Sequence, residues 1–280
     1  MPLGTATDLR LAGQLRDALN NGEIVPFYQP IMSAGPEPAL VGAEALARWN
    51  HPTDGTIPPG AWLPKLVSMG LDSSLTDAML HAVCADIARW RTEHDVAVHV
   101  NLNVTAVDLA SGNLPDLVVA ACTAHGVDPS WLTIEITEQS AMVDPDATAD
   151  TLATLHEIGC RIAIDDVGEG HSSLGRLARL DLDELKIDRQ MLLGAHTSER
   201  VVAVLHALIG LGHALDMRVV AEGVENMRDA RLLSRLGVDK LQGYGLGRPA
   251  DASTFIAEAL SHNETMPATA PDTIENVVID

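Results

Sequence analysis

The sequence predicts an α/β fold, a (β/α)8 barrel of the TIM-barrel type in which one strand can run antiparallel to the others. Eight short apolar segments rich in β-forming residues follow one another along the chain, and most are separated by stretches with helical spacing. The length of 280 residues fits one such barrel with extensions at its ends. A hydrophobic fraction of 46% is sufficient for a large core.

The expected elements begin with a short amphipathic helix over residues 5–20. The eight predicted strands are 27–32, 40–48, 96–103, 131–137, 161–167, 184–189, 218–224 and 240–247. Residues 74–94 and 145–159 are typical of the helices between them. The segment between the first two strands is too short for a helix, so that pair is expected to form a hairpin with one strand reversed. Residues 201–215 are predicted to form a buried helix, because the run is too short to span a membrane.

The chain is therefore interpreted as one domain with additional ends. Residues 1–20 form the expected lead-in helix, and residues 21–260 form the barrel domain. Residues 261–280 are polar and lack periodicity, which predicts a flexible tail.

The charge balance restricts the possible partners. A formal net charge of −21 argues against bulk nucleic acid and anionic membrane surfaces, which both bind basic proteins. The N-terminus has no secretory pattern, and Cys84, Cys122 and Cys160 lack metal-binding or redox spacing. We therefore expect no membrane insertion, reduced cysteines that act as small buried apolar residues, and a cytoplasmic location.

Polar groups close most of the predicted strands. These residues are Glu44, Asn103, Glu135, Asp165, Asp166, Lys186, Glu222 and Gln242. Any one of them alone would ordinarily be a solvated loop residue or a helix cap. In a barrel, however, the strand ends converge on one face, where carboxylates without a cation would repel one another. Oxygen ligands of this kind fit Mg²⁺ or Mn²⁺, so the pattern predicts a metal site.

The same residues lie in motifs that resemble one known family. The ordered motifs are "YQPI" (28–31), "EALARW" (44–49), "NVTAVDL" (103–109), "IEITE" (134–138), "DDVGEGHSSL" (165–174), "LKID" (185–188), "AEGVEN" (221–226) and "LQGYGLGRP" (241–249). Together they resemble the EAL family of cyclic-di-GMP phosphodiesterases over roughly residues 20–255. The resemblance implies metal-dependent hydrolysis of cyclic-di-GMP to linear pGpG in bacterial second-messenger signalling.

The resemblance also implies a role for each matching residue. It implies two Mg²⁺ or Mn²⁺ ions, with the first held by Glu44, Asn103, Glu135 and Asp165 and the second by Asp165, Asp166 and Glu222. Lys186 matches the lysine that holds or deprotonates the attacking water, and Gln242 matches a polar group near that water. Arg48 and Gln29 match substrate-binding positions, and Glu138 matches the glutamate that steadies the loop after Asp166.

Two asparagines compete for one ligand position. Asn101 and Asn103 share the same face of the predicted strand, and either could match the family's asparagine. We prefer Asn103, because it ends the strand and begins the better motif match. Asn101 is then expected one layer deeper, as a hydrogen-bonding structural residue.

The loop after the aspartate pair departs from the family pattern. Val167, Glu169 and His171 stand where the family usually has Phe, a small or hydroxylated residue, and Tyr. The two missing aromatic rings would have pinned the loop, and Glu169 adds negative charge near an anionic substrate. These changes are expected to affect the rate of hydrolysis more than the fold.

Two other function classes compete with the phosphodiesterase. A cyclic-di-GMP receptor with little catalysis is favoured by the altered loop, although all the matching ligands are present. An unrelated metal-dependent barrel hydrolase or lyase would explain the carboxylates but not the order of the motifs. The resemblance also allows a homodimer, and the sequence identifies no regulatory partner or input signal.

Overall fold

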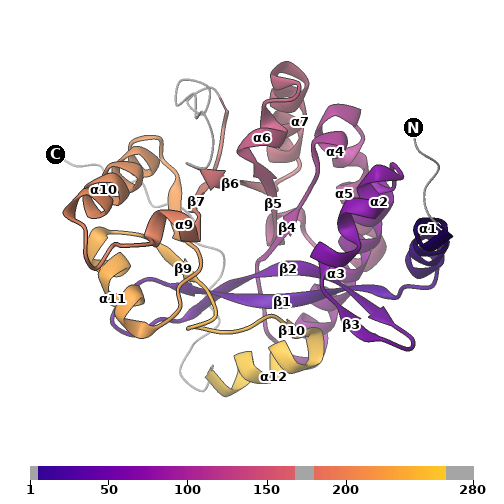
Figure 1. The fold of residues 1–280 in the computed structure, drawn as a ribbon, viewed down its shortest axis with the longest axis horizontal. Helices are drawn as coiled ribbons and strands as arrows, with labels where there is room; N and C mark the ends of the chain where they lie inside the picture. Colours follow the sequence, from indigo (N-terminus) through magenta and orange to yellow (C-terminus); the bar gives the residue numbers. More distant parts are fainter. Residues whose placement is uncertain (1–5, 168–179, 263–280) are drawn as a thin grey trace.

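The computed structural model describes residues 6–167 and 180–262, and eight of its strands close into a barrel (Figure 1). Around the barrel the order is β1–β9–β8–β7–β6–β5–β4–β2, and β2 pairs again with β1. Their bounds are β1 (Ile24–Ser33), β2 (Leu40–His51), β4 (Val100–Asn103), β5 (Leu132–Thr137), β6 (Arg161–Val167), β7 (Glu184–Ile187), β8 (Arg218–Ala221) and β9 (Lys240–Gln242). The predicted fold class is confirmed.

Strand β1 is the reversed strand that the short first connection predicted. It pairs antiparallel with β2 and with β9, whereas the other neighbours within the barrel are parallel. Two short strands extend the hairpin region: β3 (Gly55–Ile57) pairs with the end of β2, and β10 (Ala250–Asp251) pairs with β1. The sequence did not predict β3 or β10.

The predicted strand over 240–247 is wrong in its second half. Strand β9 ends at Gln242, and the glycine-rich residues that follow form a loop. Glycines weaken a strand and permit two backbones to approach closely. In this loop they permit such a close approach.

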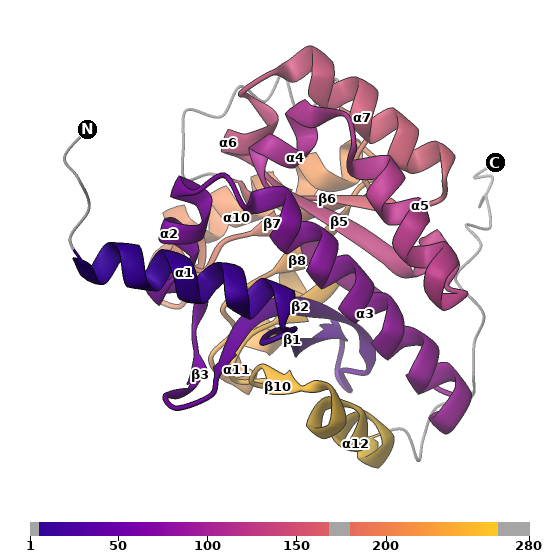
Figure 2. The same cartoon turned by 90° about the vertical axis from the view of Figure 1, so that its right-hand side faces the viewer.

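Helices cover the outside of the barrel (Figure 2). The longer ones are α1 (Ala6–Asn20), α3 (Asp72–His94), α5 (Leu114–His125), α7 (Pro145–Glu157), α10 (Glu199–Ala214), α11 (Met227–Leu236) and α12 (Ala252–His262). Shorter ones are η1 (Pro59–Ala61), α2 (Leu63–Ser68), α4 (Ala106–Ser111), η2 (Pro129–Trp131), α6 (Glu138–Ala141) and α9 (Arg189–Leu192). Within the described ranges, no helix combines the length and apolar character that a membrane span requires.

Helix α10 corrects the expectation of a buried helix. Only Leu205, Ile209 and Gly212 are buried in it, and Val204 is 46% exposed. The apolar run of residues 201–215 therefore packs on the barrel through one face, with Val201, Leu208 and Leu215 partly buried at its edge, and Val204 lies on the exposed side. Composition alone could not distinguish a half-buried helix from a fully buried one.

The loop after β4 is held by a buried carboxylate. Thr105 caps α4 in a reciprocal capping box with Asp108. Asp108 also accepts hydrogen bonds of 2.8 Å from the hydroxyls of Ser73 and Thr76 at the start of α3. These contacts anchor the segment directly behind Asn103, the last residue of β4.

Apolar side chains fill the space between the barrel and its helices. Under α3 and α12, for example, Tyr28 lies with its ring centroid 4.8 Å from Trp90 and 5.6 Å from Phe255. Cys84, Cys122 and Cys160 are buried and free, as predicted. Many strand residues are instead buried and polar, and these are Gln29, Glu44, Asn101, Thr133, Glu135, Glu184, Lys186, Lys240 and Gln242. The alternation along the strands thus gives the barrel a polar interior.

Candidate active site

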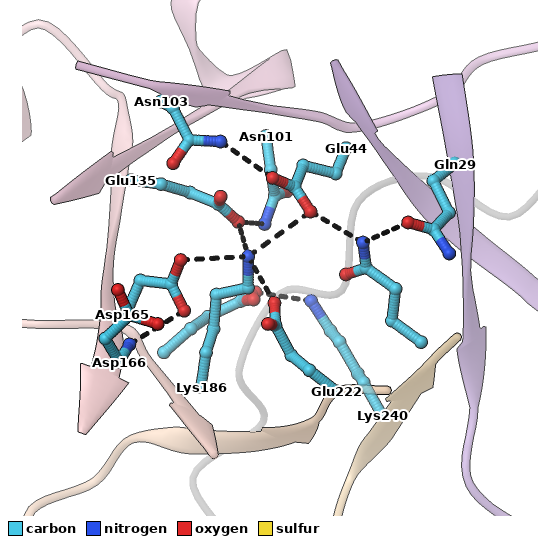
Figure 3. A network of polar contacts seen from close by, with 12 residues as sticks. Gln29, Glu44, Asn101, Asn103, Glu135, Asp165, Asp166, Lys186, Glu222 and Lys240 are labelled. Atoms are coloured by element: carbon cyan, nitrogen blue, oxygen red, sulfur yellow. Dashed lines mark hydrogen bonds and ion pairs between the residues drawn. The ribbon is translucent and has the colours of Figure 1, made fainter. Parts of the chain in front are cut away.

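Lys186 lies at the centre of a carboxylate cluster at the carboxyl ends of the parallel strands (Figure 3). Its side chain is 0% exposed, and its Nζ lies 2.6 Å from both Glu135 Oε1 and Glu222 Oε1. Glu44 Oε2 and Asp165 Oδ2 lie farther away, at 3.5 and 4.0 Å. Four carboxylates from four different elements therefore surround one buried ammonium group.

Side-chain amides fix the carboxylates from outside this cluster. Asn103 Nδ2 donates to Glu44 Oε1 at 2.7 Å, and Gln242 Nε2 donates to Glu44 Oε2 at 2.6 Å. Asn101 Nδ2 donates to Glu135 Oε1 at 2.8 Å. Asn101 is buried and Asn103 is exposed at the strand end, which agrees with the expected difference in depth.

Gln29 connects β1 to the same network. Its Oε1 accepts a hydrogen bond of 3.3 Å from Gln242 Nε2, and its Nε2 donates to the carbonyl of Gly247 at 3.2 Å. The reversed strand therefore contributes one amide to the site and holds the loop after β9 beside it.

A β-bulge brings the two adjacent aspartates to the site. The register between β6 and β7 shifts between Ile164 and Val167, and Asp166 has a left-handed backbone with φ 58°. Its N–H donates to Asp165 Oδ1 at 2.8 Å. In a regular strand, successive side chains point to opposite faces, and the bulge breaks this alternation at Asp166.

Burial and mutual charge set the protonation of the cluster. Burial, followed by the charges of Glu44 and Asp165, raises the pKa of Glu135 well above its usual value, although Lys186 opposes this. The pKa of Glu222 rises to about 7, again mainly through burial. Burial also pushes the pKa of Glu44 up, but Lys186 and the amide hydrogen bonds outweigh it and lower the pKa. The carboxylates raise the pKa of Lys186 against its burial, so the lysine remains charged.

The donor chemistry of this cluster fits a hard divalent cation. Glu135 Oε2, Glu222 Oε1 and Gln242 Oε1 are buried and accept no aligned hydrogen bond within the described part of the chain. Glu222 Oε1 is close to Lys186 Nζ, but that contact is an ion pair without hydrogen-bond geometry. Carboxylate and amide oxygens of this kind are the ligands that Mg²⁺ and Mn²⁺ prefer.

The ammonium group of Lys186 supplies positive charge among the carboxylates, at the place where a metal ion would do so. Across residues 6–167 and 180–262, no three His, Cys, Asp or Glu side chains converge on one point with the geometry of a bound ion. The carboxylates converge on Lys186 Nζ instead. Binding of a metal would therefore require the lysine and the carboxylates to rearrange around it.

The glycine-rich loop after β9 packs backbone against backbone on the loop after β8, beside the cluster. A Cβ on Gly243 would lie 2.2 Å from the nitrogen of Val224, and one on Gly245 would lie 2.3 Å from the carbonyl carbon of Glu225. Val224 N donates to Gln242 O at 3.0 Å, and Gly245 N donates to Val224 O at 2.8 Å. The loop after β9 thus holds the loop that follows Glu222.

The remaining predicted residues lie around this centre. Arg48 is partly buried, with its guanidinium 5.9 Å from the centroid of Phe27 and near the Tyr244 side chain and the Glu44 carboxylate. Glu138 is buried at the start of α6, one residue after Thr137, which pairs with Asp165. Val167 is fully buried in β6, whereas Glu169 and His171 lie outside the described residues.

Sequence reasoning missed several parts of the site. The bulge at Asp166 was signalled only by two consecutive acidic residues in an apolar strand. Tyr244 is 59% exposed and stacks on Arg248 at 4.6 Å, in the segment misread as a strand. A buried ion pair between Lys240 and Glu184 lies deeper in the barrel and had no distinct sequence signal.

Comparisons with known proteins agree with this arrangement. A family model described as "EAL domain" matches residues 12–249. The bifunctional diguanylate cyclase/cyclic di-GMP phosphodiesterase MucR of Pseudomonas aeruginosa is 39% identical over 250 residues, which cover 89% of this chain and 36% of that protein. The cyclic di-GMP phosphodiesterase NbdA of the same species is 33% identical over 242 residues, covering 86% of this chain and 31% of that protein. The chain therefore spans about a third of the length of these relatives.

A solved structure supports the same relationship. The MucR phosphodiesterase of Pseudomonas aeruginosa in complex with c-di-GMP superimposes with a TM-score of 0.82 and 38% sequence identity. The match covers 88% of this chain and 99% of that chain.

Proposed function

This chain belongs to the EAL domain family, and from that membership we propose that it hydrolyses cyclic di-GMP to linear pGpG with the help of divalent metal ions. Relatives named as cyclic di-GMP phosphodiesterases share 33–39% of its residues. A related phosphodiesterase structure is described as a complex with c-di-GMP. Because the chain covers only a third of the full relatives, the activity is proposed for the barrel domain alone.

The observation that carries the proposal is the cluster around Lys186. Carboxylate and amide oxygens from six strands meet at the carboxyl end of the barrel, which is where enzymes of this architecture place their active sites. Buried carboxylates beside unbonded oxygen acceptors favour a cationic ligand such as a divalent metal ion. Hydrolysis of a phosphodiester needs positive charge at this place.

We propose the metal ligands from the match of these residues to the family's motifs. The first ion would be held by Glu44, Asn103, Glu135 and Asp165, and the second by Asp165, Asp166 and Glu222. Two bound Mg²⁺ or Mn²⁺ ions would supply an activated water and stabilisation of negative charge on the phosphate.

The chain's own residues would complete the reaction geometry. The Lys186 ammonium, already within 4.0 Å of four carboxylates, would orient the attacking water and add to the positive charge. Gln242 and Gln29 would hold that water and the substrate through their amides, and Arg48 would bind a substrate phosphate. Glu138 would steady the loop after Asp166 from the start of α6.

Incubation with cyclic di-GMP tests this function directly. The full chain with Mg²⁺ or Mn²⁺ is expected to form pGpG, which chromatography separates from the substrate. Excess chelator should abolish the reaction, and Mg²⁺ or Mn²⁺ should restore it. Ca²⁺ should support it poorly, because that ion is larger and less strict in its geometry.

The same assay separates the rival functions. Tight binding of cyclic di-GMP without formation of pGpG, whichever metal ion is added, would favour a receptor. The departures from the family pattern at Val167, Glu169 and His171 would then explain the lack of hydrolysis. Full turnover in excess chelator would overturn the metal mechanism. Metal-dependent turnover of a different substrate alone would overturn the proposed substrate.

Two further assignments rest on the same proposal. We place the protein in the cytoplasm, because its three cysteines are free and a second-messenger hydrolase acts where the messenger is made. A homodimer remains a proposal, and light scattering of the purified chain tests it.

A further inference from the structure

Two histidines meet on the outside of the barrel, between helices α3 and α5. His81 Nδ1 lies 3.3 Å from His125 Nε2, and the two rings stand at 71° with centroids 5.5 Å apart. The side chain of His81 is 40% exposed, so ions in solution can reach the pair. The proposed reaction at the other cluster makes no use of these residues.

The spacing of the two nitrogens matches one edge of a tetrahedral metal site. Imidazole nitrogens bind Zn²⁺ at about 2.0–2.1 Å, which places two such ligands roughly 3.3–3.4 Å apart at the tetrahedral angle. A hydrogen bond between the rings gives a similar separation, so the distance alone does not decide between the two. The surroundings of His81 favour a metal.

Asp77 lies behind His81 on the same helix. Its Oδ1 is 3.8 Å from His81 Nε2, the nitrogen that faces away from His125. At that distance the carboxylate makes no hydrogen bond with the ring, but its negative charge favours a cation beside the histidine pair.

We propose that His81 and His125 form a second metal site, which binds a divalent ion of the zinc, nickel or copper class. In the described portion of the chain, no third His, Cys, Asp or Glu side chain completes the pair, so water fills the remaining coordination positions. Imidazole ligands favour these ions over Mg²⁺, whereas carboxylate oxygens suit Mg²⁺ and Mn²⁺. The bound ion would join α3 to α5.

Titration with Zn²⁺ in saturating Mg²⁺ tests the site, because excess Mg²⁺ would compete with Zn²⁺ for the carboxylate cluster. Calorimetry on the full chain is expected to show that one Zn²⁺ ion binds. His81→Gln and His125→Gln should each lower the affinity for this ion at least about tenfold. His206→Gln is the matched control, since His206 is an exposed histidine on α10. Asp77→Asn should weaken binding less than loss of either histidine. Equal Zn²⁺ binding by all four variants and the original chain would show that the pair is only hydrogen-bonded.

A spectroscopic measurement keeps the test independent of variant stability. One equivalent of Cu²⁺ added to the original chain should give an electron paramagnetic resonance spectrum with nitrogen couplings from two imidazoles. The metal should also raise the thermal midpoint of the original chain and of His206→Gln, but not that of His81→Gln. A Cu²⁺ spectrum without imidazole nitrogen couplings would overturn the proposal.

Discussion

Lys186 neutralises the site when no metal is bound. Replacement by Met would leave Glu135 and Glu222 buried without their nearest cation. Loss of one partner from a buried ion pair costs about 3–5 kcal/mol, so we expect Lys186→Met to destabilise the metal-free protein by that amount. Mg²⁺ should recover part of the loss, because the ion replaces the missing charge.

Urea unfolding with and without Mg²⁺ measures this effect. Arg200→Met is a suitable control, because it removes an exposed cation from α10. A Lys186→Met protein as stable as the original in chelator would mean that its carboxylates are protonated rather than paired.

Glu44 and Asp165 should be required for hydrolysis but not for folding. Both carboxylates face Lys186, and Glu44 also accepts from two amides. Removal of one preorganised charged group from a site of this kind commonly costs about 100- to 1,000-fold in rate. Glu44→Ala and Asp165→Ala should therefore lose at least about 100-fold in kcat while their circular dichroism remains unchanged. Glu157→Ala, on the exposed side of α7, should keep full activity; near-normal turnover by either site variant would show that its residue was misassigned.

The paired loops after β8 and β9 make a prediction about Gly243. A Cβ at this position would lie 2.2 Å from Val224 N and 2.3 Å from Val224 O, and backbone atoms cannot yield as a flexible side chain can. Gly243→Ala should cost about 1–3 kcal/mol in stability and displace the residues that follow Glu222. Displacements of about 1 Å can lower rates about 100-fold, so kcat should fall more than substrate affinity.

Gly210→Ala provides the matched comparison. Nothing lies within 4 Å of its added Cβ, and it sits within α10, where Ala is favoured by about 1 kcal/mol. Its activity should be unchanged and its thermal midpoint slightly higher. Equal kcat in the two glycine variants would show that the loop contact does not position the site.

The sequence predicted best those features that depend on neighbouring residues rather than on contacts between distant segments. Glu44, Glu135 and Glu222 could be placed together because each carboxylate interrupts an apolar run and barrel geometry brings the carboxyl halves of the strands to one face. Glu44 and Glu135 lie within β2 and β5 rather than at their ends, however, and only Glu222 follows its strand. The left-handed backbone of Asp166 could not be predicted, because it depends on a register shift against β7. The segment after Gln242 was wrongly predicted to be a strand, because its close packing on Val224 joins residues that are distant in the sequence. Likewise, the exposed side of α10 depends on what covers that helix.

Basic side chains gather at the amino ends of the barrel strands, where one of them, Lys240, pairs with the buried Glu184. Carboxylates gather at the carboxyl ends of the strands, whereas Arg161, Arg218 and Lys240 lie at the starts of β6, β8 and β9. His99, just before β4, lies near these cations. Burial first, and then the charges of Arg161 and Lys240, lower its pKa to about 4.

The low pKa of His99 predicts a loss of stability in mild acid. The unfolded chain takes up a proton near the ordinary pKa of 6.5, whereas the folded chain does so only near 4. The contribution of the neutral His99 side chain to the free energy of unfolding is therefore fully present above pH 6.5 and is lost as the pH falls towards 4. By linkage it amounts to about 2 kcal/mol between pH 7 and pH 5. Urea unfolding should show that His99→Gln removes this part of the pH dependence and that His206→Gln retains it; parallel profiles for all three proteins would contradict the assignment.

The reversed strand β1 also has a consequence for synthesis of the protein. Ile31 of β1 pairs with Gln242 of β9. The ribosome makes β1 early, so β1 lacks this neighbour until residue 242 has emerged. At 5–20 residues per second, that interval is on the order of 10–40 s. Throughout it, β1 has an unpaired edge towards β9, which is the kind of surface that chaperones protect. The hydrogen bond between Gln242 and Glu44 forms only when the barrel closes, so a nascent chain cannot contain the complete site.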